Sequence, residues 1–275
     1  MIVVLILAPI IGGLLMGLDR KLTARIHGRI GPPLLQPFYD VFKLLGKQPV
    51  VLNRVKTVYV YLHLVFMLMV FVLLTLGQDM LMALFAHAFS TIALVLGGMS
   101  VRSPYSRIGS QRKIMQMLAY EPVLVLLVVG IALKNWSFMA RDVIYMNQPL
   151  LTALPLVFLA YLAAMIIKLE KSPFDVSTSH HAHQEIVKGV TLEFTGPYLA
   201  LIEITHFYEV ALLFGVIVMF WATNLAVGLP LAAACFLFQI VVDNAFARLT
   251  TMWMVRFMWT LPMILAVGNI AWFYV

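Results

Sequence analysis

Three ionisable side chains interrupt an apolar stretch in the second half of the chain. Glu203, His206 and Glu209 follow one another at intervals of three residues within 197–221. On a helix they would lie roughly 9, 13 and 18 Å from position 197 and spread over about a third of the circumference. Charges buried in a membrane must pair, face internal water or be protonated. The pattern therefore indicates either a proton relay or a hydrogen-bonded network that only fixes helix packing.

A fourth carboxylate, Glu121, lies inside another apolar run, between Tyr120 and Pro122. A proline within a helix leaves the carbonyl one turn earlier without its usual donor, which favours a polar or hydrated pocket beside the carboxylate. Glu121 is expected to belong to the same relay. The alternative is a simple ion pair with Arg112 or Lys113.

The most polar segment lies between these runs, at 168–196. Glu185, Gly189 and Glu193 are spaced four residues apart, so a short helix would place both carboxylates on nearly one side, with Gly189 allowing another backbone to approach closely. Asp175 follows a turn at Pro173. The alternative is an ordinary solvated loop. His180, His181 and His183 lack the cysteine partners or the i, i+4 spacing of common zinc sites, so no metal site is predicted.

The composition assigns all of these residues to a membrane protein. Of the 275 residues, 63% are hydrophobic and 11% are charged, far from globular averages. The sequence predicts an all-α, polytopic helix bundle that forms a single membrane domain over 1–275. Eight spans are expected, each long enough for a hydrocarbon layer of about 30 Å, at 2–18, 57–76, 79–99, 114–133, 149–168, 197–221, 224–242 and 251–274. An amphipathic interfacial helix is expected after Gly31-Pro32-Pro33.

The basic residues predict the orientation. All of the 19 Lys and Arg except Lys134 and Arg141 lie in or beside four segments, 19–56, 100–113, 168–196 and 243–256, whose loops are expected at 19–56, 100–113, 169–196 and 243–250. By the positive-inside rule these segments face the cytoplasm of a prokaryotic cell membrane, and an even number of spans places both termini outside. The net charge of +7 is then a topology signal and a place for lipid or a partner. Nucleic acid is not an expected partner, because no basic groove with interleaved aromatic residues is present.

The chain carries one cysteine, Cys235, within a predicted helix. An iron–sulfur cluster normally takes four thiolates, and no phosphate loop or dinucleotide fingerprint is present. No catalytic centre and no cofactor site is therefore expected in this chain. If it takes part in redox chemistry, the electrons travel in partner subunits.

Several motifs carry a resemblance to a known family. They are, in order, Arg29-Ile-Gly-Pro32 followed by Gln36, Asp40 and Lys43-Leu-Leu45, then Tyr120-Glu121, Pro173-Phe-Asp175, Glu185, Gly189 and Glu193-Phe-Thr-Gly196. In this fixed order over most of the chain, they resemble the membrane subunit shared by respiratory complex I (the NuoH type) and membrane-bound NiFe hydrogenases. The stretches 172–185 and 196–209 are most similar to the EchB subunit of energy-converting hydrogenases.

The resemblance implies a function that spacing alone does not. It implies an ion-translocating and docking subunit that couples ferredoxin oxidation and H2 chemistry to movement of protons or sodium ions. The expected partners are a NiFe large subunit, an iron–sulfur small subunit, a ferredoxin-like subunit and an antiporter-like membrane subunit. The NiFe centre and the clusters would lie in those partners. The segments 19–56 and 169–196 would form the docking floor.

The resemblance also implies an ion path from Asp175, Glu185 and Glu193 to Glu121. Together with the buried residues of 197–221, the candidate path is Glu121, Asp175, Glu185, Glu193, Glu203, His206 and Glu209. The supporting polar or docking residues are Arg29, Asp40, Lys43, Tyr120, Lys171, His183, Asp243 and Arg248.

The sequence departs from the complex I pattern at two positions. His206 aligns with an acidic residue of the complex I members, and His183 stands where another acidic residue is expected. These differences disfavour a quinone chamber of the complex I type. A quinone-site subunit of complex I and a passive membrane anchor are the alternatives.

Overall fold

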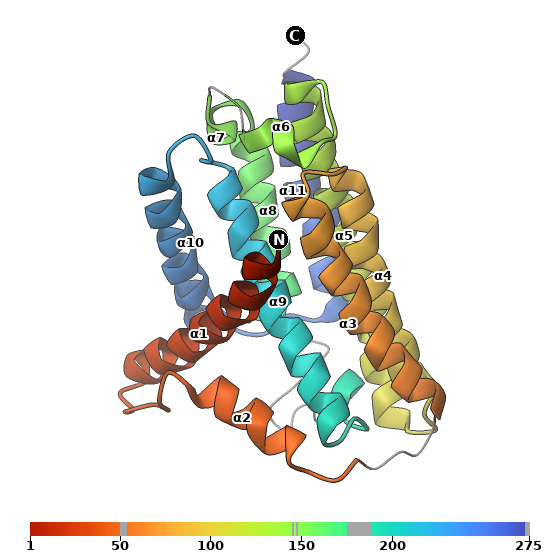
Figure 1. Ribbon diagram of the computed structural model, residues 1–275. Coiled ribbons are helices and arrows are strands. Elements are labelled where there is room, and N and C mark those ends of the chain that lie inside the picture. The colour runs from red at the N-terminus through yellow and green to blue at the C-terminus, as the bar shows by residue number, and fades with distance from the viewer. Residues whose placement is uncertain (50–53, 145, 147, 175–188, 273–275) are drawn as a thin grey trace.

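The computed structural model describes residues 1–49, 54–144, 146, 148–174 and 189–272. Within these ranges the chain is helical and contains no strand, which confirms the predicted fold class (Figure 1). The elements are α1 (Ile2–Ile26), α2 (Gln36–Leu45), α3 (Arg54–Thr75), α4 (Met80–Met99), α5 (Pro104–Asn135), α6 (Ala140–Ile144), α7 (Leu150–Ala153), α8 (Pro155–Lys168), the 3-10 turn η1 (Gly189–Thr191), α9 (Pro197–Met219), α10 (Leu225–Ala245) and α11 (Thr251–Trp272).

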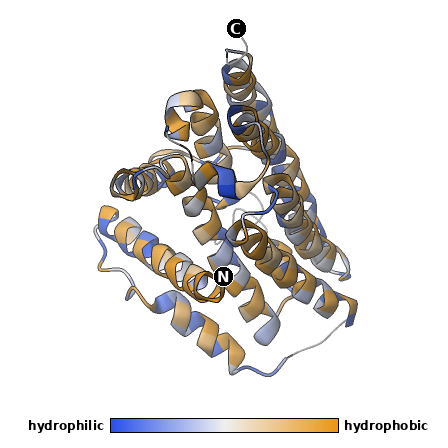
Figure 2. Cartoon of the chain, turned by 45° about the horizontal axis from the view of Figure 1, so that its top comes forward, coloured by the Kyte–Doolittle hydropathy of each residue, from blue (hydrophilic) through white to orange (hydrophobic). Residues whose placement is uncertain are grey.

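Seven of the described helices are long and apolar enough to cross a membrane, namely α1, α3, α4, α5, α9, α10 and α11. Figure 2 shows hydrophobic residues along nearly the whole length of these helices. Large apolar side chains such as Phe85 and Leu261 face outward, each 53% exposed. Outward apolar faces are the arrangement expected where the solvent is lipid. The chain is a multi-pass membrane protein.

The span predicted over 149–168 is divided in two. The backbone leaves the helical conformation at Leu154, and α8 begins at Pro155 with 14 residues. Proline lacks an N–H group and disfavours helical geometry in the residue before it, so a break at this point is physically reasonable. Asn269 of α11 bridges the break: its Oδ1 accepts from the N–H groups of Leu156 (2.8 Å) and Val157 (3.2 Å), and its Nδ2 donates to the carbonyl of Ala153 (3.1 Å).

Pro122 has the opposite outcome, because α5 continues through it from Pro104 to Asn135. The carbonyl that this proline frees, four residues earlier at Leu118, accepts a hydrogen bond from Nε1 of Trp259 at 3.2 Å. The pocket expected beside Glu121 is thus not needed to satisfy that carbonyl.

Several predicted boundaries are wrong. Residues 104–113, expected in a loop, form the first turns of α5, and α1 extends to Ile26 instead of ending at residue 18. The prediction places polar residues in loops because they are costly in lipid. In the structure Ser106 and Ser110 are fully buried against neighbouring helices instead.

The amphipathic helix predicted after Pro33 is present as α2. Val41 is buried, and the ring of Phe38 packs edge-on against that of Phe207 on α9, with 5.6 Å between centroids. Phe42 lies on the outer side and is 67% exposed. In Figure 1, α2 lies across the end of the bundle opposite to α6 and α7. It therefore forms part of the floor at the end where the predicted basic loops gather.

Close helix contacts hold the bundle around α9. A Cβ atom on Gly12 of α1 would lie 1.9 Å from the carbonyl oxygen of Phe207, so only glycine permits this crossing. On the other side, the hydroxyl of Tyr161 on α8 donates to the carbonyl of Leu213 at 2.7 Å. The helices α1 and α8 are thereby held against α9, which forms one wall of the site described below.

Candidate functional site

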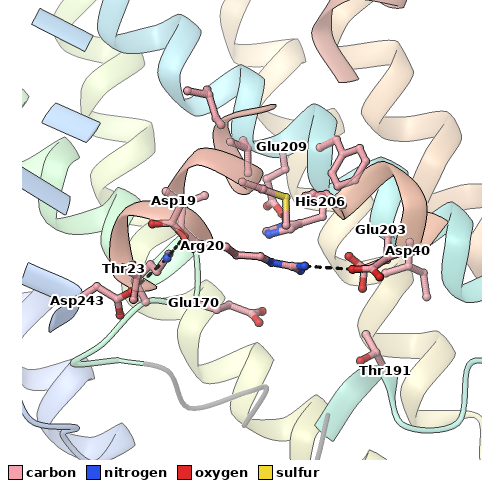
Figure 3. Close-up of a pocket in the computed structure, with 18 of the residues that line it drawn as sticks. Asp19, Arg20, Thr23, Asp40, Glu170, Thr191, Glu203, His206, Glu209 and Asp243 are labelled. Carbon is pink, nitrogen blue, oxygen red and sulfur yellow. Dashed lines mark hydrogen bonds and ion pairs between the residues drawn. The ribbon is translucent and has the colours of Figure 1, made fainter. Parts of the chain in front are cut away.

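A cavity of about 980 Å³ lies among α1, α2, α9, the C-terminal part of α10 and the segment after α8 (Figure 3). Eight of the residues singled out from the sequence contribute to its lining: Asp40, Lys43, Lys171, Glu203, His206, Glu209, Asp243 and Arg248. Residues from distant parts of the chain thus meet in one polar chamber. A chamber of this size has room for the internal water that buried charges require when they are not paired.

Glu209 is the centre of a buried ionic network on the cavity wall. Its Oε1 lies 2.8 Å from Nζ of Lys168 and 3.7 Å from Nε2 of His87, and its Oε2 accepts a hydrogen bond from Nδ1 of His206 at 3.2 Å. The Glu209 side chain is only 13% exposed and that of Lys168 only 2%. Since an unpaired charge at this depth would cost several kcal/mol, pairing explains how both groups are tolerated. Of the three residues spaced along this helix, His206 and Glu209 are therefore in direct contact.

Lys168 extends this network away from the cavity. Its ammonium donates to the hydroxyl of Tyr120 at 3.1 Å and lies 4.6 Å from the centre of that ring. It also interacts electrostatically with Glu121, the next residue of α5. Glu121 does not line the cavity, and its Oε1 is buried without a hydrogen-bond partner among the described residues. Lys168 is thus the link between the cavity wall and Glu121.

A second buried pair lies nearer the end of the bundle. Lys113 of α5 forms an ion pair with Glu170, just after α8, and both residues line the cavity. Lys113 is therefore not the simple partner of Glu121 that the sequence left open. One turn further along α5, Nε2 of Gln116 donates to the carbonyl of Phe174 at 3.0 Å. These contacts attach the beginning of the 169–174 segment to α5.

Lys171 ties the same segment to two other helices. Its ammonium pairs with Asp19 of α1 and lies 3.1 Å from Oδ2 of Asp243 on α10 (Figure 3). The N–H of Ser172 donates to Oδ1 of Asp243 at 2.9 Å. Burial by itself lowers the pKa of Lys171, but the carboxylates of Asp19 and Asp243 outweigh it and raise the pKa above the ordinary value. A raised lysine pKa means that this pairing is complete below the ordinary lysine pKa and is lost only as the pH rises through the raised value.

On the opposite side of the cavity, α1 is joined to α2. Nη1 of Arg20 lies 3.1 Å from Oδ2 of Asp40, and Gln36 donates to the other oxygen of Asp40 at 2.9 Å. Lys43, one turn further along α2, also lines the cavity. Arg29 does not: it is exposed and interacts with His27.

Glu193 lies outside the cavity lining. Its backbone carbonyl accepts a hydrogen bond from the buried ammonium of Lys56, which also lies 5.0 Å from the ring centre of Phe194.

The close approach expected at Gly189 is confirmed: a Cβ on Gly109 of α5 would lie 2.5 Å from the carbonyl carbon of Gly189. Residues 189–191 form a 3-10 turn instead of the longer helix considered from the sequence.

Part of the predicted path lies outside the described residues. Asp175, Glu185 and the supporting residue His183 belong to 175–188, as do His180 and His181. Their predicted roles stay predictions. Within the described part of the chain, no group of three or more His, Cys, Asp or Glu side chains could hold a metal ion.

Several members of the site are not identified by the sequence pattern, and three of them show why. Lys168 is visible there only as part of a polar run, His87 resembles an ordinary packing histidine, and Asp19 does not stand out. A signal exists for Lys168, because a lysine that ends an apolar run of 13 helical residues is costly in lipid and requires a partner. No signal in the sequence pairs it with Glu209, which lies 41 positions further along the chain.

Comparison with known proteins places this geometry in a family. Residues 1–274 match the model of the NADH dehydrogenase family. The H-type subunits of the NADH-quinone oxidoreductases of Bacillus cereus (strain B4264) and Bacillus mycoides (strain KBAB4) are 28% and 27% identical over 241 residues, which cover 78% of this chain and 72% of each relative.

Among solved structures, a chain of the membrane-bound sulfane sulfur reductase, an archaeal respiratory membrane complex, matches with a TM-score of 0.86 and 26% identity. The match covers 99% of this chain and 97% of that one. The family match spans almost the whole sequence, and relatives and fold agree with it. This chain therefore belongs to the NADH dehydrogenase family, in the superfamily of the NuoH-type membrane subunits of the NADH-quinone oxidoreductases.

Proposed function

We propose that this chain is the ion-translocating and docking membrane subunit of a ferredoxin-linked, energy-converting NiFe hydrogenase of the EchB type, in a prokaryotic cell membrane. Its similarity to subunits of respiratory membrane complexes supports the assignment to a membrane subunit of such a complex. The observation that carries the transport role is the buried network that runs from the cavity through His206, Glu209 and Lys168 toward Glu121.

Two observations support a branch outside the quinone oxidoreductases. The motifs of 172–185 and 196–209 resemble EchB, and His206 replaces an acidic residue of the complex I pattern. In this proposal the partner subunits are the NiFe large subunit, the iron–sulfur small subunit, a ferredoxin-like subunit and an antiporter-like membrane subunit.

The mechanism follows from charge balance. Reduction of a centre in a docked partner adds negative charge near the cavity end of the bundle, which favours proton uptake by nearby carboxylates and imidazoles. His206 is 30% exposed on its side chain and lines the cavity, so it can take up a proton there and pass it to Glu209. Charge movement at Glu209 then changes the field at Lys168 and Glu121. The chain itself transfers no electron in this scheme.

The first prediction concerns the path. In complexes reconstituted into vesicles, E121Q and E209Q should each reduce H2-linked ion pumping at least tenfold, because the amide cannot accept a proton. Hydrogen evolution from an artificial reduced donor should persist. Pumping is measured with a fluorescent indicator of the transmembrane ion gradient, and assembly is checked by subunit composition.

D142N is the matched control, because Asp142 lies on α6, at the other end of the bundle from the cavity. Normal pumping by both E121Q and E209Q would refute the relay and leave a passive anchor. If the purified complex contains no NiFe large subunit, the hydrogenase assignment is wrong even where pumping is affected.

A quinone-site subunit is the second candidate, since the structure contains a cavity that the sequence did not anticipate. Its volume of about 980 Å³ is within the range of small-molecule sites. Its many charged residues, with Asp19, Arg20 and Asp40 among them, are less suited to an isoprenoid tail than an apolar cleft. Quinone extracted in stoichiometric amount from the complex, or reduction of an added quinone, would select this candidate.

A further inference from the structure

Two buried carboxylates share one ammonium group in this site. Lys168 is 2% exposed and lies 2.8 Å from Glu209 on one side. On its other side it donates to Tyr120, whose neighbour in the chain is Glu121. Glu121 interacts with Lys168 electrostatically, yet its buried Oε1 has no hydrogen-bond partner among the described residues. Lys168 therefore neutralises one carboxylate and leaves the other short of a partner.

The groups around these two carboxylates set the net charge of the cluster. Lys113 also acts on this cluster, and it is paired with Glu170. His206 and His87 both contact Glu209. While both histidines are neutral, two ionised carboxylates and one ammonium leave a net negative charge in a medium of low dielectric constant, where isolated charge is strongly disfavoured. One bound proton restores neutrality.

We propose that Glu121 and Glu209 are protonated alternately, and that the position of the Lys168 ammonium decides which of them holds the proton. In the conformation observed, the ammonium faces Glu209, and Glu121 is the neutral acid. When the ammonium turns toward Glu121, Glu121 releases its proton to water or to a basic group of the neighbouring membrane subunit, and Glu209 takes up one proton from the cavity side. The cluster therefore holds one proton before and after the exchange. Lys168 is thus a positioning residue. Its role in transport rests on the proposed function, whereas the sharing of one proton between Glu121 and Glu209 does not.

Infrared difference spectroscopy of the purified complex tests the proposal, because a protonated carboxylic acid has a C=O stretching band that a carboxylate lacks. Against the wild-type spectrum, E121Q should lose one such band. E209Q should lose the same band, because Lys168, released from Glu209, pairs with Glu121 and ionises it. K168R should keep the band, since it retains the positive charge.

D142N is the control here as well. Asp142 lies on α6, where it pairs with Arg141 at 3.6 Å, and it is not among the groups that act on Lys168. Its replacement should leave the Glu121 band in place. The proposal is overturned if the band is unchanged in E121Q, or if it persists in E209Q. Should the K168R complex fail to assemble, E121Q and E209Q decide the matter without it.

The outcome can be separated from that of the proposed function. If pumping is lost in E121Q and E209Q but the band pattern does not appear, the transport role stands and the shared proton is wrong. If the band pattern appears while pumping is normal, the shared proton stands and the transport role is wrong.

Discussion

At the scale of single residues, the protein keeps buried charges in pairs contributed by different helices. Glu209 of α9 meets Lys168 at the end of α8, and Lys113 of α5 meets Glu170. Removing one member of a buried pair typically costs about 3–5 kcal/mol, because the other charge is left uncompensated. Such pairs are weak evidence for stability, since well-packed apolar residues often do as well. Stability alone therefore does not account for these pairs, and the proposed transport role gives them a function.

Asn269 supports a second prediction at this scale. N269A leaves the N–H groups of Leu156 and Val157 and the carbonyl of Ala153 without the partner that bridges the α7–α8 break. Each buried polar group left unsatisfied costs about 1–3 kcal/mol. The midpoint of thermal inactivation of the purified complex should therefore fall clearly.

Asn224 provides the comparison, since it also caps a helix, accepting a hydrogen bond from the N–H of Ala226 at 2.9 Å. It is exposed, so that in N224A water can replace the side chain, and the loss should be about 1 kcal/mol or less. Equal losses in the two variants would show that the Asn269 bridge contributes nothing beyond an ordinary cap.

The sequence predicted the members of the site better than their partners. Glu203, His206 and Glu209 could be found because ionisable groups within an apolar run are conspicuous, and their depth follows from helix geometry. The pairing of Glu209 with Lys168 could not be found, because it depends on how α8 and α9 pack. The same limit applies to Asn269, which completes a break in the chain more than a hundred positions earlier.

At the scale of elements, glycine contacts hold the turn η1 against α5. Gly109 of α5 and Gly189 of η1 touch through their backbones, and Gly98 of α4 accepts a hydrogen bond from Ser106 at 2.8 Å. Glu193 lies two residues after this turn, and α9 begins at Pro197. The position of Glu193 thus depends on a contact that tolerates no side chain.

A third prediction concerns the contact between Gly109 and the turn η1. In G109A the new Cβ would lie 2.5 Å from both the carbonyl carbon of Gly189 and the nitrogen of Val190, so the turn must move. Hydrogen exchange of the amides in 189–194 should become faster by at least tenfold. G215A, also within a helix but with open space around the new Cβ, should leave this exchange unchanged and gain up to about 1 kcal/mol of helix stability. Unchanged exchange in G109A would contradict the anchoring role.

The elements themselves could largely be predicted from hydropathy, and the exceptions have physical causes. Two prolines with the same local signature have opposite outcomes. At Pro122 the indole of Trp259 satisfies the freed carbonyl and α5 continues, whereas at Pro155 the side chain of Asn269 satisfies the groups of a broken helix. The deciding groups come from α11 in both cases, so no window of local sequence contains them.

At the scale of the whole molecule, the polar groups are gathered at one end. The cavity, α2 and the segment after α8 occupy the end opposite to α6, α7 and the end of α11 (Figure 1). If the positive-inside rule holds for this chain, the cavity opens toward the cytoplasm. Docked redox subunits would then lie directly over it.

This orientation gives the last prediction. The native Cys235 is buried, so single cysteines introduced at exposed sites can be labelled with little background. W136C, at a position that is 88% exposed at the end of α5, should react with a membrane-impermeant maleimide in intact cells. R29C should react only in inverted membrane vesicles. The reverse pattern would invert the topology and remove the cytoplasmic docking floor.

The short helix α8 has a consequence for the electrical behaviour of the protein. Its 14 residues span roughly 21 Å, against a hydrocarbon thickness of about 30 Å. Lys168 at its end contacts Glu209 on the wall of the cavity. Where conducting solution fills that cavity, the insulating layer is thinner than in the surrounding bilayer. The membrane voltage falls over this shortened path, at about 2.3 kcal/mol per unit charge and 100 mV. A charge displaced between Glu209 and Glu121 would therefore sense a steeper local field than one displaced equally far elsewhere in the membrane.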